Sequence, residues 1–175
     1  MNETPPALSD WIRDIPDFPR PGIVFKDITP LLGNAQAFAE SVQQLAAPFR
    51  GEQIDHLVAV EARGFLFGAP LAVELGVGIV PVRKPGKLPG EIRRFDYDLE
   101  YGSDALEIHI DSIGPGDRVL VVDDLLATGG TVQACCELLE QCGAVVIACA
   151  FLIDLTFLHG AETLAPHSIF SVIQY

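Results

Sequence analysis

Two adjacent carboxylates stand just before a glycine-rich turn, and together they have the chemistry of a site for a phosphorylated sugar. The carboxylates are Asp123 and Asp124, and the turn is Thr128-Gly129-Gly130-Thr131. Glycines let backbone N–H groups approach an anion closely, and a helix that follows adds the partial positive charge of its N-terminus. The carboxylates would repel a phosphate unless they bind ribose hydroxyls or a Mg²⁺ that the ligand carries. The alternative is a capped helix start preceded by two turn aspartates.

The residues around this turn predict the two elements that hold it. Residues 119–122 are four consecutive aliphatic residues, the pattern of a strand buried on both faces of a parallel sheet. We expect the carboxylates where that strand leaves the sheet. Apolar residues then recur at helical spacing over 132–141. A glycine-rich turn between the carboxyl end of a parallel strand and a helix is where open α/β sheets bind ligands.

The rest of the chain repeats this alternation of strands and helices. Apolar spacing predicts an amphipathic helix over 35–49, and a nearly all-apolar helix over 65–75. Continuous apolar runs predict further strands at 54–60, 78–82, 144–153 and 169–173. The predicted fold class is α/β, with an open, mostly parallel sheet flanked by helices and joined by right-handed crossovers.

The region 83–110 interrupts the alternation. Pro-Gly pairs at 85–86 and 89–90 are turn signals, and short alternating runs lie around them at 91–99 and 106–110. These patterns predict a β-hairpin flap inserted between the second and third parallel strands. The sequence contains no repeat and no linker to a second domain, so we expect residues 1–175 to form a single domain.

The chain is acidic, and its few cations are concentrated in one region. The formal net charge of −13 argues against nucleic-acid binding, because neutralising phosphates needs clustered Lys and Arg. Five of the 11 Lys and Arg residues fall between positions 83 and 94, so a small anionic ligand remains compatible with the charge. They are Arg83, Lys84, Lys87, Arg93 and Arg94, and no motif assigns a role to the last two.

Cysteine usage points to a cytoplasmic protein. The four cysteines lie in apolar helix and strand patterns, without the paired spacing of a zinc site. We therefore expect them to be buried and reduced, as in a reducing compartment. They are Cys135, Cys136, Cys142 and Cys149. The sequence shows neither a signal peptide nor a run long enough to span a membrane, so we expect no membrane partner.

The central motif also resembles that of a known family. Residues 121–131, Val-Val-Asp-Asp-Leu-Leu-Ala-Thr-Gly-Gly-Thr, are similar to the phosphoribosyl-pyrophosphate motif of the type I phosphoribosyltransferases, and most of all to their adenine branch. Other stretches agree in order and spacing over nearly the whole chain. They are residues 12–19 (Ile-Arg-Asp-Ile-Pro-Asp-Phe-Pro), 21–30 (Pro-Gly-Ile-Val-Phe-Lys-Asp-Ile-Thr-Pro), 61–68 (Glu-Ala-Arg-Gly-Phe-Leu-Phe-Gly), 83–89 (Arg-Lys-Pro-Gly-Lys-Leu-Pro), 99–102 (Leu-Glu-Tyr-Gly) and 174–175 (Gln-Tyr).

This resemblance implies an enzyme of purine salvage. Members of the branch join adenine to the ribose 5-phosphate of phosphoribosyl pyrophosphate, with Mg²⁺, giving AMP and pyrophosphate. Loss of pyrophosphate leaves an oxocarbenium-like centre, so the site must hold an anionic leaving group and exclude water. The resemblance also implies a homodimer, a flap at 83–110, and a hood over the base formed by the N-terminal segment 1–34 together with the C-terminus.

The resemblance assigns the contacts to the sugar and its phosphates. Asp123 and Asp124 are expected at the ribose hydroxyls. Arg63 is expected at the pyrophosphate, in a loop that often carries a non-proline cis peptide, here Glu61-Ala62. The cradle of the 5-phosphate comprises Ala127, Thr128, Gly129, Gly130 and Thr131. The flap entrance brings cations to the pyrophosphate, some from the neighbouring subunit, and these are Arg83, Lys84 and Lys87.

The resemblance further implies how the base is read and how its proton moves. Glu100, on the flap, matches the acid/base that exchanges a proton with the imidazole ring, and Tyr101 packs or hydrogen-bonds beside it. Main-chain atoms at Val24 and Lys26 read the edge of adenine. A main-chain carbonyl at this edge accepts a hydrogen bond from the exocyclic amine of adenine. Hypoxanthine carries an oxygen at that position, so two acceptors would face each other unsatisfied and hypoxanthine is rejected. The residues that sandwich the ring are Phe25 and Leu155.

Two alternatives to an adenine enzyme remain open at this point. One is a phosphoribosyltransferase for a 6-oxopurine such as xanthine, because related enzymes share the cradle. The other is a non-catalytic regulator that senses phosphoribosyl pyrophosphate. Such a regulator needs a nucleic-acid surface, which a chain with a net charge of −13 and no basic domain does not offer.

Overall fold

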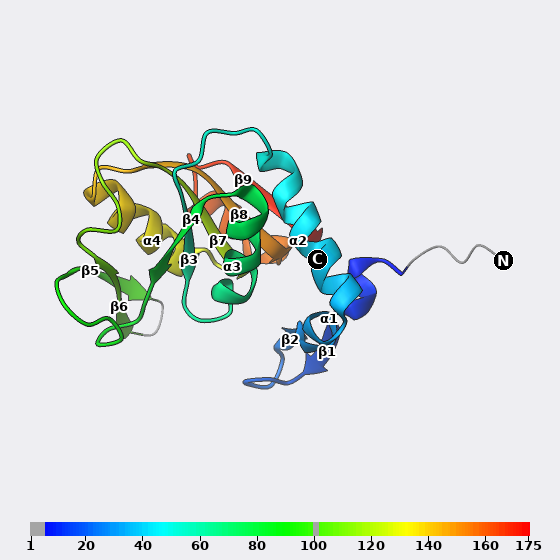
Figure 1. Ribbon diagram of the computed structural model, residues 1–175. Coiled ribbons are helices and arrows are strands. Elements are labelled where there is room, and N and C mark those ends of the chain that lie inside the picture. The colour runs from blue at the N-terminus through cyan, green and yellow to red at the C-terminus, as the bar shows by residue number, and fades with distance from the viewer. Residues whose placement is uncertain (1–5, 100–101) are drawn as a thin grey trace.

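A five-stranded parallel sheet forms the centre of the computed structural model, which describes residues 6–99 and 102–175 (Figure 1). Its strand order is β4-β3-β7-β8-β9, and every neighbouring pair is parallel. Parallel neighbours need crossover connections, and helices supply most of them here. The strands are β3 (His56–Val60), β4 (Gly78–Val82), β7 (Arg118–Leu126), β8 (Val145–Asp154) and β9 (Ile169–Gln174).

Helices cover both faces of this sheet, and each face has its own apolar core. Alternate residues of a strand point to opposite faces, so Leu57 of β3 joins one core and Val58 joins the other. The first core contains α2 (Ala35–Ala46) and α3 (Gly64–Leu75). The second contains α4 (Gly130–Gln141) and strand β6 (Gly102–His109). Residues buried on both faces explain the continuous apolar runs in the strand sequences.

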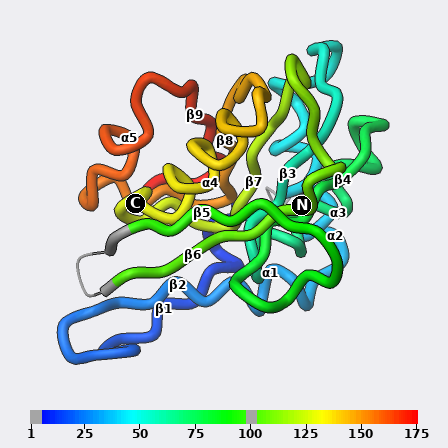
Figure 2. Tube along the Cα trace, turned by 90° about the vertical axis from the view of Figure 1, so that its left-hand side faces the viewer, coloured from blue at the N-terminus to red at the C-terminus, as the bar shows by residue number. Residues whose placement is uncertain are grey.

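Two antiparallel hairpins stand outside the parallel sheet, and both lie on the lower side of the molecule in Figure 1. The first pairs β1 (Arg13–Pro16) with β2 (Val24–Asp27). The second pairs β5 (Ile92–Leu99) with β6 (Gly102–His109). An isolated bridge between Arg83 and Glu107 ties this second hairpin to the segment that leaves β4. In Figure 2, turned by 90°, the two hairpins overlap, but Figure 1 shows them apart, the second hairpin near α4 and the first hairpin near α1.

Short helical segments complete the fold. A 3-10 turn, η1, precedes the first hairpin, and α1 follows it; both contribute buried leucines to the core beside α2. The segment after β8 makes a 3-10 turn and one short helix before β9 begins. These segments are η1 (Leu8–Trp11), α1 (Thr29–Gly33), η2 (Ala47–Phe49), η3 (Thr156–Leu158) and α5 (Gly160–Thr163).

The structure confirms the α/β class, the parallel sheet and the inserted hairpin, and it corrects three details. Asp123 and Asp124 lie within β7 rather than beyond it, because β8 continues beside β7 as far as the pair Leu126 and Asp154. Strand β6 is longer than the apolar run at 106–110, since a ladder with β5 sustains it from Gly102. Three of the four cysteines are buried, whereas Cys142 at the end of α4 is partly exposed.

Candidate active site

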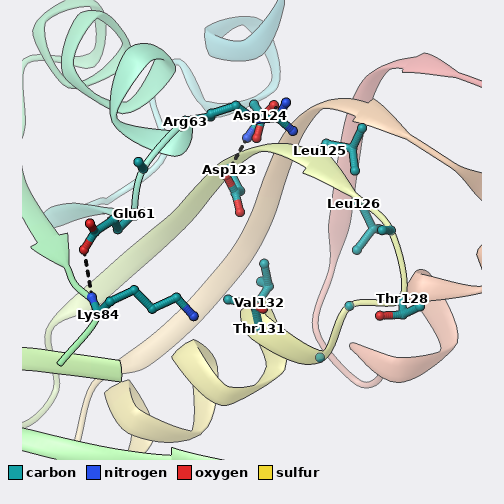
Figure 3. Close-up of a pocket in the computed structure, with 14 residues that line it drawn as sticks. Glu61, Arg63, Lys84, Asp123, Asp124, Leu125, Leu126, Thr128, Thr131 and Val132 are labelled. Carbon is teal, nitrogen blue, oxygen red and sulfur yellow. Dashed lines mark hydrogen bonds and ion pairs between the residues drawn. The ribbon is translucent and has the colours of Figure 1, made fainter. Parts of the chain in front are cut away.

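A pocket of about 280 Å³ lies at the carboxyl ends of β3, β4 and β7. It is lined by the loop after β3, by the first residues after β4, by the end of β7 and by the turn into α4 (Figure 3). The lining residues are Glu61, Ala62, Arg63, Lys84, Asp123, Asp124, Leu125, Leu126, Ala127, Thr128, Gly129, Gly130, Thr131 and Val132. Nine of the residues expected from the sequence therefore meet in one pocket.

The turn into α4 has the geometry of an anion cradle. Gly129 is the N-cap residue of α4 and has φ 86°, a conformation that glycine adopts without strain. Because glycine has no side chain, the N-cap itself offers no acceptor to the first N–H groups of the helix, which stay available for a ligand. A Cβ at this position would lie 2.8 Å from the carbonyl oxygen of Gly160. The segment at α5 thus supports the cradle from behind and requires glycine there.

The two carboxylates at the end of β7 are held close to the start of α3. A Cβ on Gly64 would lie 2.9 Å from Oδ1 of Asp123, so only glycine lets the helix approach this strand. The backbone N–H of Asp124 donates to Oδ1 of Asp123 at 2.8 Å. Burial raises the pKa of Asp123 well above its usual value, and repulsion by Asp124 raises it further. Removing these carboxylates from water is unfavourable for folding, and groups perturbed in this way cluster at functional sites.

Arg63 faces the second of these carboxylates. Its Nη2 lies 2.9 Å from Oδ2 of Asp124, whose side chain is 5% exposed. Burial raises the pKa of Asp124, and the Arg63 charge opposes that rise. Oδ2 is nevertheless buried without a hydrogen-bond partner among the described residues, so the contact is an ion pair without hydrogen-bond alignment. The lone pairs of Asp124 are therefore incompletely satisfied until a hydroxyl or cation arrives.

Glu61 organises the cations on the opposite side of the pocket. Its Oε2 accepts hydrogen bonds from Nε of Arg83 at 2.9 Å and from the backbone N–H of Lys84 at 2.8 Å. The hydrogen bond from Arg83 is the main reason that the pKa of Glu61 lies below its usual value. The peptide bond Glu61–Ala62, which the family motif made a candidate for a cis bond, is cis. Arg83 thus lies next to the pocket, whereas Lys84 lines it.

The residues expected to read the base lie outside the pocket lining. Phe25 of β2 has its ring centroid 5.2 Å from the Arg63 guanidinium carbon, so the first hairpin reaches the edge of the site. Lys26 forms an ion pair of 2.7 Å with Asp14 and lies 3.7 Å from the ring centroid of Tyr175. The first hairpin and the C-terminus therefore contact one another beside the pocket.

The remaining expected residues lie in different surroundings. Leu155 is buried at the start of η3, and its N–H donates to the carbonyl of Leu126 at 2.9 Å. Val24 is 47% exposed on β2, and Lys87 is exposed in the loop after β4. Glu100 and Tyr101 lie outside the described residues. Arg93 and Arg94 point elsewhere: Arg93 donates to the backbone of Gln141 on α4, and Arg94 pairs with Asp96 on its own strand.

Three polar residues at or near the pocket, Glu61, Tyr97 and Asp104, were not predicted as site residues. Glu61 stands directly after a predicted strand, so its place at the carboxyl end was a usable signal. Tyr97 and Asp104 instead contact Lys84 from the second hairpin. The sequence shows only a tyrosine in the alternating run 91–99 and an aspartate just before the run 106–110. The register of the hairpin, which places them opposite each other, is visible only in the structure.

Comparisons with known proteins agree with this geometry. Residues 31–173 match the family model described as "Phosphoribosyl transferase domain". An adenine phosphoribosyltransferase of Roseiflexus sp. is 60% identical over 168 residues, which cover 96% of this chain and 98% of that protein. The crystal structure of adenine phosphoribosyltransferase from Thermoanaerobacter pseudethanolicus has a TM-score of 0.93 and 55% identity, covering 96% of this chain and 98% of the other. The enzyme from Saccharomyces cerevisiae, complexed with adenine and an imino-altritol bisphosphate, has a TM-score of 0.88 and 41% identity, covering 94% and 96%.

Proposed function

The chain belongs to the phosphoribosyl transferase family, and we infer that it transfers the phosphoribosyl group of phosphoribosyl pyrophosphate to adenine, giving AMP and pyrophosphate. The observation that carries this function is a single pocket that combines a glycine-capped helix start, two carboxylates and two cations. A sugar with a phosphate at one end and a pyrophosphate at the other matches that distribution of charge. The enzyme is accordingly a pentosyltransferase of purine salvage.

The sugar phosphate is assigned to the turn and the strand end. The 5-phosphate accepts hydrogen bonds from backbone N–H groups around Gly129 and Gly130, where the α4 N-terminus favours negative charge. Hydroxyls of Thr128 and Thr131 add donors, and Ala127 closes the turn. Asp123 and Asp124 accept hydrogen bonds from the ribose hydroxyls. This assignment gives the incompletely satisfied Oδ2 of Asp124 a donor.

The pyrophosphate is assigned to the cations opposite the cradle. Arg63 presents a planar guanidinium that suits bidentate contact with phosphate oxygens. Lys84 and Arg83 supply further charge, and Lys87 adds a cation on the exposed loop. Three of these cations already form ion pairs with carboxylates in the structure. Arg63 pairs with Asp124, Lys84 with Asp104 and Arg83 with Glu61. Binding therefore brings the ligand to cations whose positions are already fixed by internal ion pairs.

The adenine is assigned to the first hairpin and the C-terminal segment. Main-chain groups of Val24 and Lys26 read its edge, and Phe25 and Leu155 enclose its ring. The approach of Phe25 to Arg63 supports this placement, because it brings the hairpin beside the pyrophosphate contact. Glu100 is assigned the exchange of the ring proton, and Tyr101 packs or hydrogen-bonds beside it when the flap covers the site. Exclusion of water by that cover prevents hydrolysis of the reactive sugar.

Mg²⁺ is proposed as a partner of the ligand rather than of the protein alone. Within residues 6–99 and 102–175, no cluster of three or more His, Cys, Asp or Glu side chains is arranged to hold a metal ion. Asp123 and Asp124 nevertheless fit a cation that arrives on the sugar, since they are adjacent carboxylates and one oxygen lacks a hydrogen-bond donor. When bound, Mg²⁺ neutralises part of the pyrophosphate charge.

A homodimer is supported by the outer surface of α3. Leu66 and Val73 are seven residues apart, hence on one helical face, and are 44% and 83% exposed. Ile79, on the edge strand β4, is 40% exposed. Exposed apolar side chains on one helix face and one sheet edge are typical of an interface. A second subunit placed there could contribute flap cations to its neighbour.

A cytoplasmic location is supported by the cysteines. All four are free, and Sγ of Cys136 lies 3.6 Å from Sγ of Cys149, in hydrogen-bond contact and without a disulfide bond. Secreted proteins tend to use such pairs as disulfides. In the part of the chain that the structure describes, no helix has the length and apolar character needed to cross a bilayer.

A base-competition assay tests the activity. Initial rates of nucleotide formation from phosphoribosyl pyrophosphate are measured with adenine, hypoxanthine, guanine and xanthine. We expect adenine to exceed each oxopurine by about 10³-fold or more in kcat/KM, because a mismatched acceptor leaves buried polar groups unsatisfied. Preferred turnover of an oxopurine would instead support the xanthine alternative, which the comparisons do not favour. Absence of turnover together with tight, salt-sensitive binding to nucleic acid would support a regulator.

A further inference from the structure

The side chain of Lys84 is held by two residues of the second hairpin. Its Nζ forms an ion pair with Oδ2 of Asp104 and donates to the hydroxyl of Tyr97 at 3.0 Å. Tyr97 and Asp104 are direct partners in the ladder between β5 and β6, so they stand side by side on one face. The Tyr97 hydroxyl also lies 3.3 Å from Oδ2 of Asp104, which closes a three-residue network.

The other end of Lys84 is fixed as well. Its backbone N–H donates to Glu61, and the neighbouring Arg83 makes two backbone hydrogen bonds with Glu107 of β6, at 2.8 and 2.9 Å. The Glu107 carboxylate is buried and accepts a hydrogen bond from the N–H of Gly86 at 2.9 Å. The segment that carries Lys84 is thus bound to the hairpin on both sides of this residue. In Figure 3 the side chain extends from this anchored backbone into the pocket.

The network keeps an ammonium in a half-buried position. Burial alone would lower the pKa of Lys84, but the hydrogen bonds that Lys84 donates to Asp104 and Tyr97 outweigh it and raise that pKa. Burial would raise the pKa of Asp104, but the hydrogen bond that Asp104 accepts from Lys84 holds this pKa below its usual value. An ammonium has three hydrogens, of which these partners use two. The third can go to a phosphate oxygen.

From these contacts we propose that Asp104 is a positioning residue for pyrophosphate binding. It fixes the flexible stem of Lys84 so that the ammonium already points into the pocket when the ligand arrives. Lysine otherwise loses much rotamer freedom on binding, so fixing it in advance favours the bound state. This inference rests on the proposed function, which assigns the pyrophosphate to Lys84. It adds a residue of the hairpin that acts through that lysine.

A double-mutant cycle tests the inference, with the full-length chain and magnesium pyrophosphate as the titrant in calorimetry. Asp104→Ala should weaken binding about three- to tenfold, the loss expected from one unfixed long side chain. Asp104→Asn keeps an acceptor oxygen and should stay within about twofold of the parent. In a Lys84→Gln background, all three residues at position 104 should bind equally. Asp96→Ala is the matched control, because it removes an exposed carboxylate from the same hairpin and should change nothing.

Two results would overturn the inference while leaving the proposed function intact. The first is pyrophosphate binding by Asp104→Ala that equals or exceeds that of the parent, which would make Asp104 a competitor of the ligand. The second is a loss that persists in the Lys84→Gln background, which would make its role merely structural. Failure of the parent chain to form AMP from adenine, measured in parallel, would instead contradict the proposed function itself.

Discussion

The guanidinium of Arg63 and the carboxylate of Asp124 lie 2.9 Å apart and join the loop after β3 to the end of β7. Arg63 offsets part of the cost of burying Asp124, whose pKa is raised by its removal from water. Neither group is fully satisfied by the other, because Oδ2 has no aligned donor among the described residues. A ligand with a pyrophosphate and vicinal hydroxyls can replace each partner with a better one. The pair therefore serves as a ligand-exchange site as much as a structural contact.

Asp124→Asn should impair catalysis strongly while leaving the fold intact. The amide is similar in size but cannot balance Arg63 or accept hydroxyl bonds as a carboxylate does. We expect kcat/KM to fall about 10²- to 10³-fold, the usual loss for one charged group in such a site. Steady-state kinetics and circular dichroism measure the two effects. Glu74→Gln is the matched control, since it breaks an ion pair of 2.9 Å with Arg50 at the other end of α3. Unchanged kinetics in Asp124→Asn would remove this residue from the site.

Asp123→Asn should make the protein more stable at neutral pH. The asparagine oxygen can still accept from the N–H of Asp124, while the partly buried charge and its repulsion with Asp124 are lost. We expect a gain of about 1 kcal/mol in the free energy of unfolding, alongside reduced activity. Denaturant unfolding at several pH values measures it.

The pH dependence of that gain has a definite sign. Because the folded pKa of Asp123 is raised, the folded parent binds more protons than the unfolded chain above the ordinary value of 3.8. Its stability therefore falls as pH rises towards the folded pKa. The advantage of the variant should be absent near pH 3.8, grow with pH and then level off. An advantage that shrinks as pH rises would contradict the account.

Gly129→Ala should damage the cradle more than a comparable glycine substitution elsewhere. Both Gly129 (φ 86°) and Gly116 (φ 87°) have left-handed backbones, so alanine strains each by about 1 kcal/mol. A Cβ meets nothing within 4 Å at Gly116, whereas at Gly129 it approaches the carbonyl of Gly160 to 2.8 Å. We expect Gly116→Ala to keep its KM for phosphoribosyl pyrophosphate and Gly129→Ala to raise it about tenfold or more. Equal behaviour of the two variants would show that the close approach is unimportant.

Glu100→Gln should separate chemistry from binding. If the carboxylate exchanges a proton with the base, its loss should lower the single-turnover rate by about 10²-fold or more. Affinity for phosphoribosyl pyrophosphate should change little, because the residue is assigned to the base side. Rapid-quench kinetics and equilibrium binding give the two numbers. The reverse pattern, weak binding with an intact chemical rate, would assign Glu100 to the pyrophosphate.

Much of the fold could be predicted because the buried strands are continuous apolar runs. Residues 119–122 and 57–60 bury both faces, so composition alone identifies them as central parallel strands. The exact end of β7 could not be predicted, since pairing with β8 rather than local sequence extends it through Asp123 and Asp124. The same holds for β6, which depends on its partner β5.

The pocket was predictable where residues follow strand ends, and not where distant segments meet. The turn 127–131 and Arg63 both adjoin predicted strands, so topology brings them together. Contacts that depend on the path of a hairpin leave no local pattern in the sequence. The ion pair between Asp104 and Lys84 and the approach of Phe25 to Arg63 are two such contacts. The close approach of Gly129 to the carbonyl oxygen of Gly160 joins residues 31 positions apart in the sequence. It could not be predicted from the sequence either.

A crystal structure with AMP and pyrophosphate tests the whole assignment most directly. The account predicts the 5-phosphate at the N–H groups around Gly129 and Gly130, with the ribose hydroxyls on Asp123 and Asp124. It predicts pyrophosphate on Arg63 and Lys84, and adenine against Phe25 with its edge at the main chain of Val24 and Lys26. A nucleotide bound with its phosphate away from the α4 N-terminus, or with its base away from the first hairpin, would contradict this assignment.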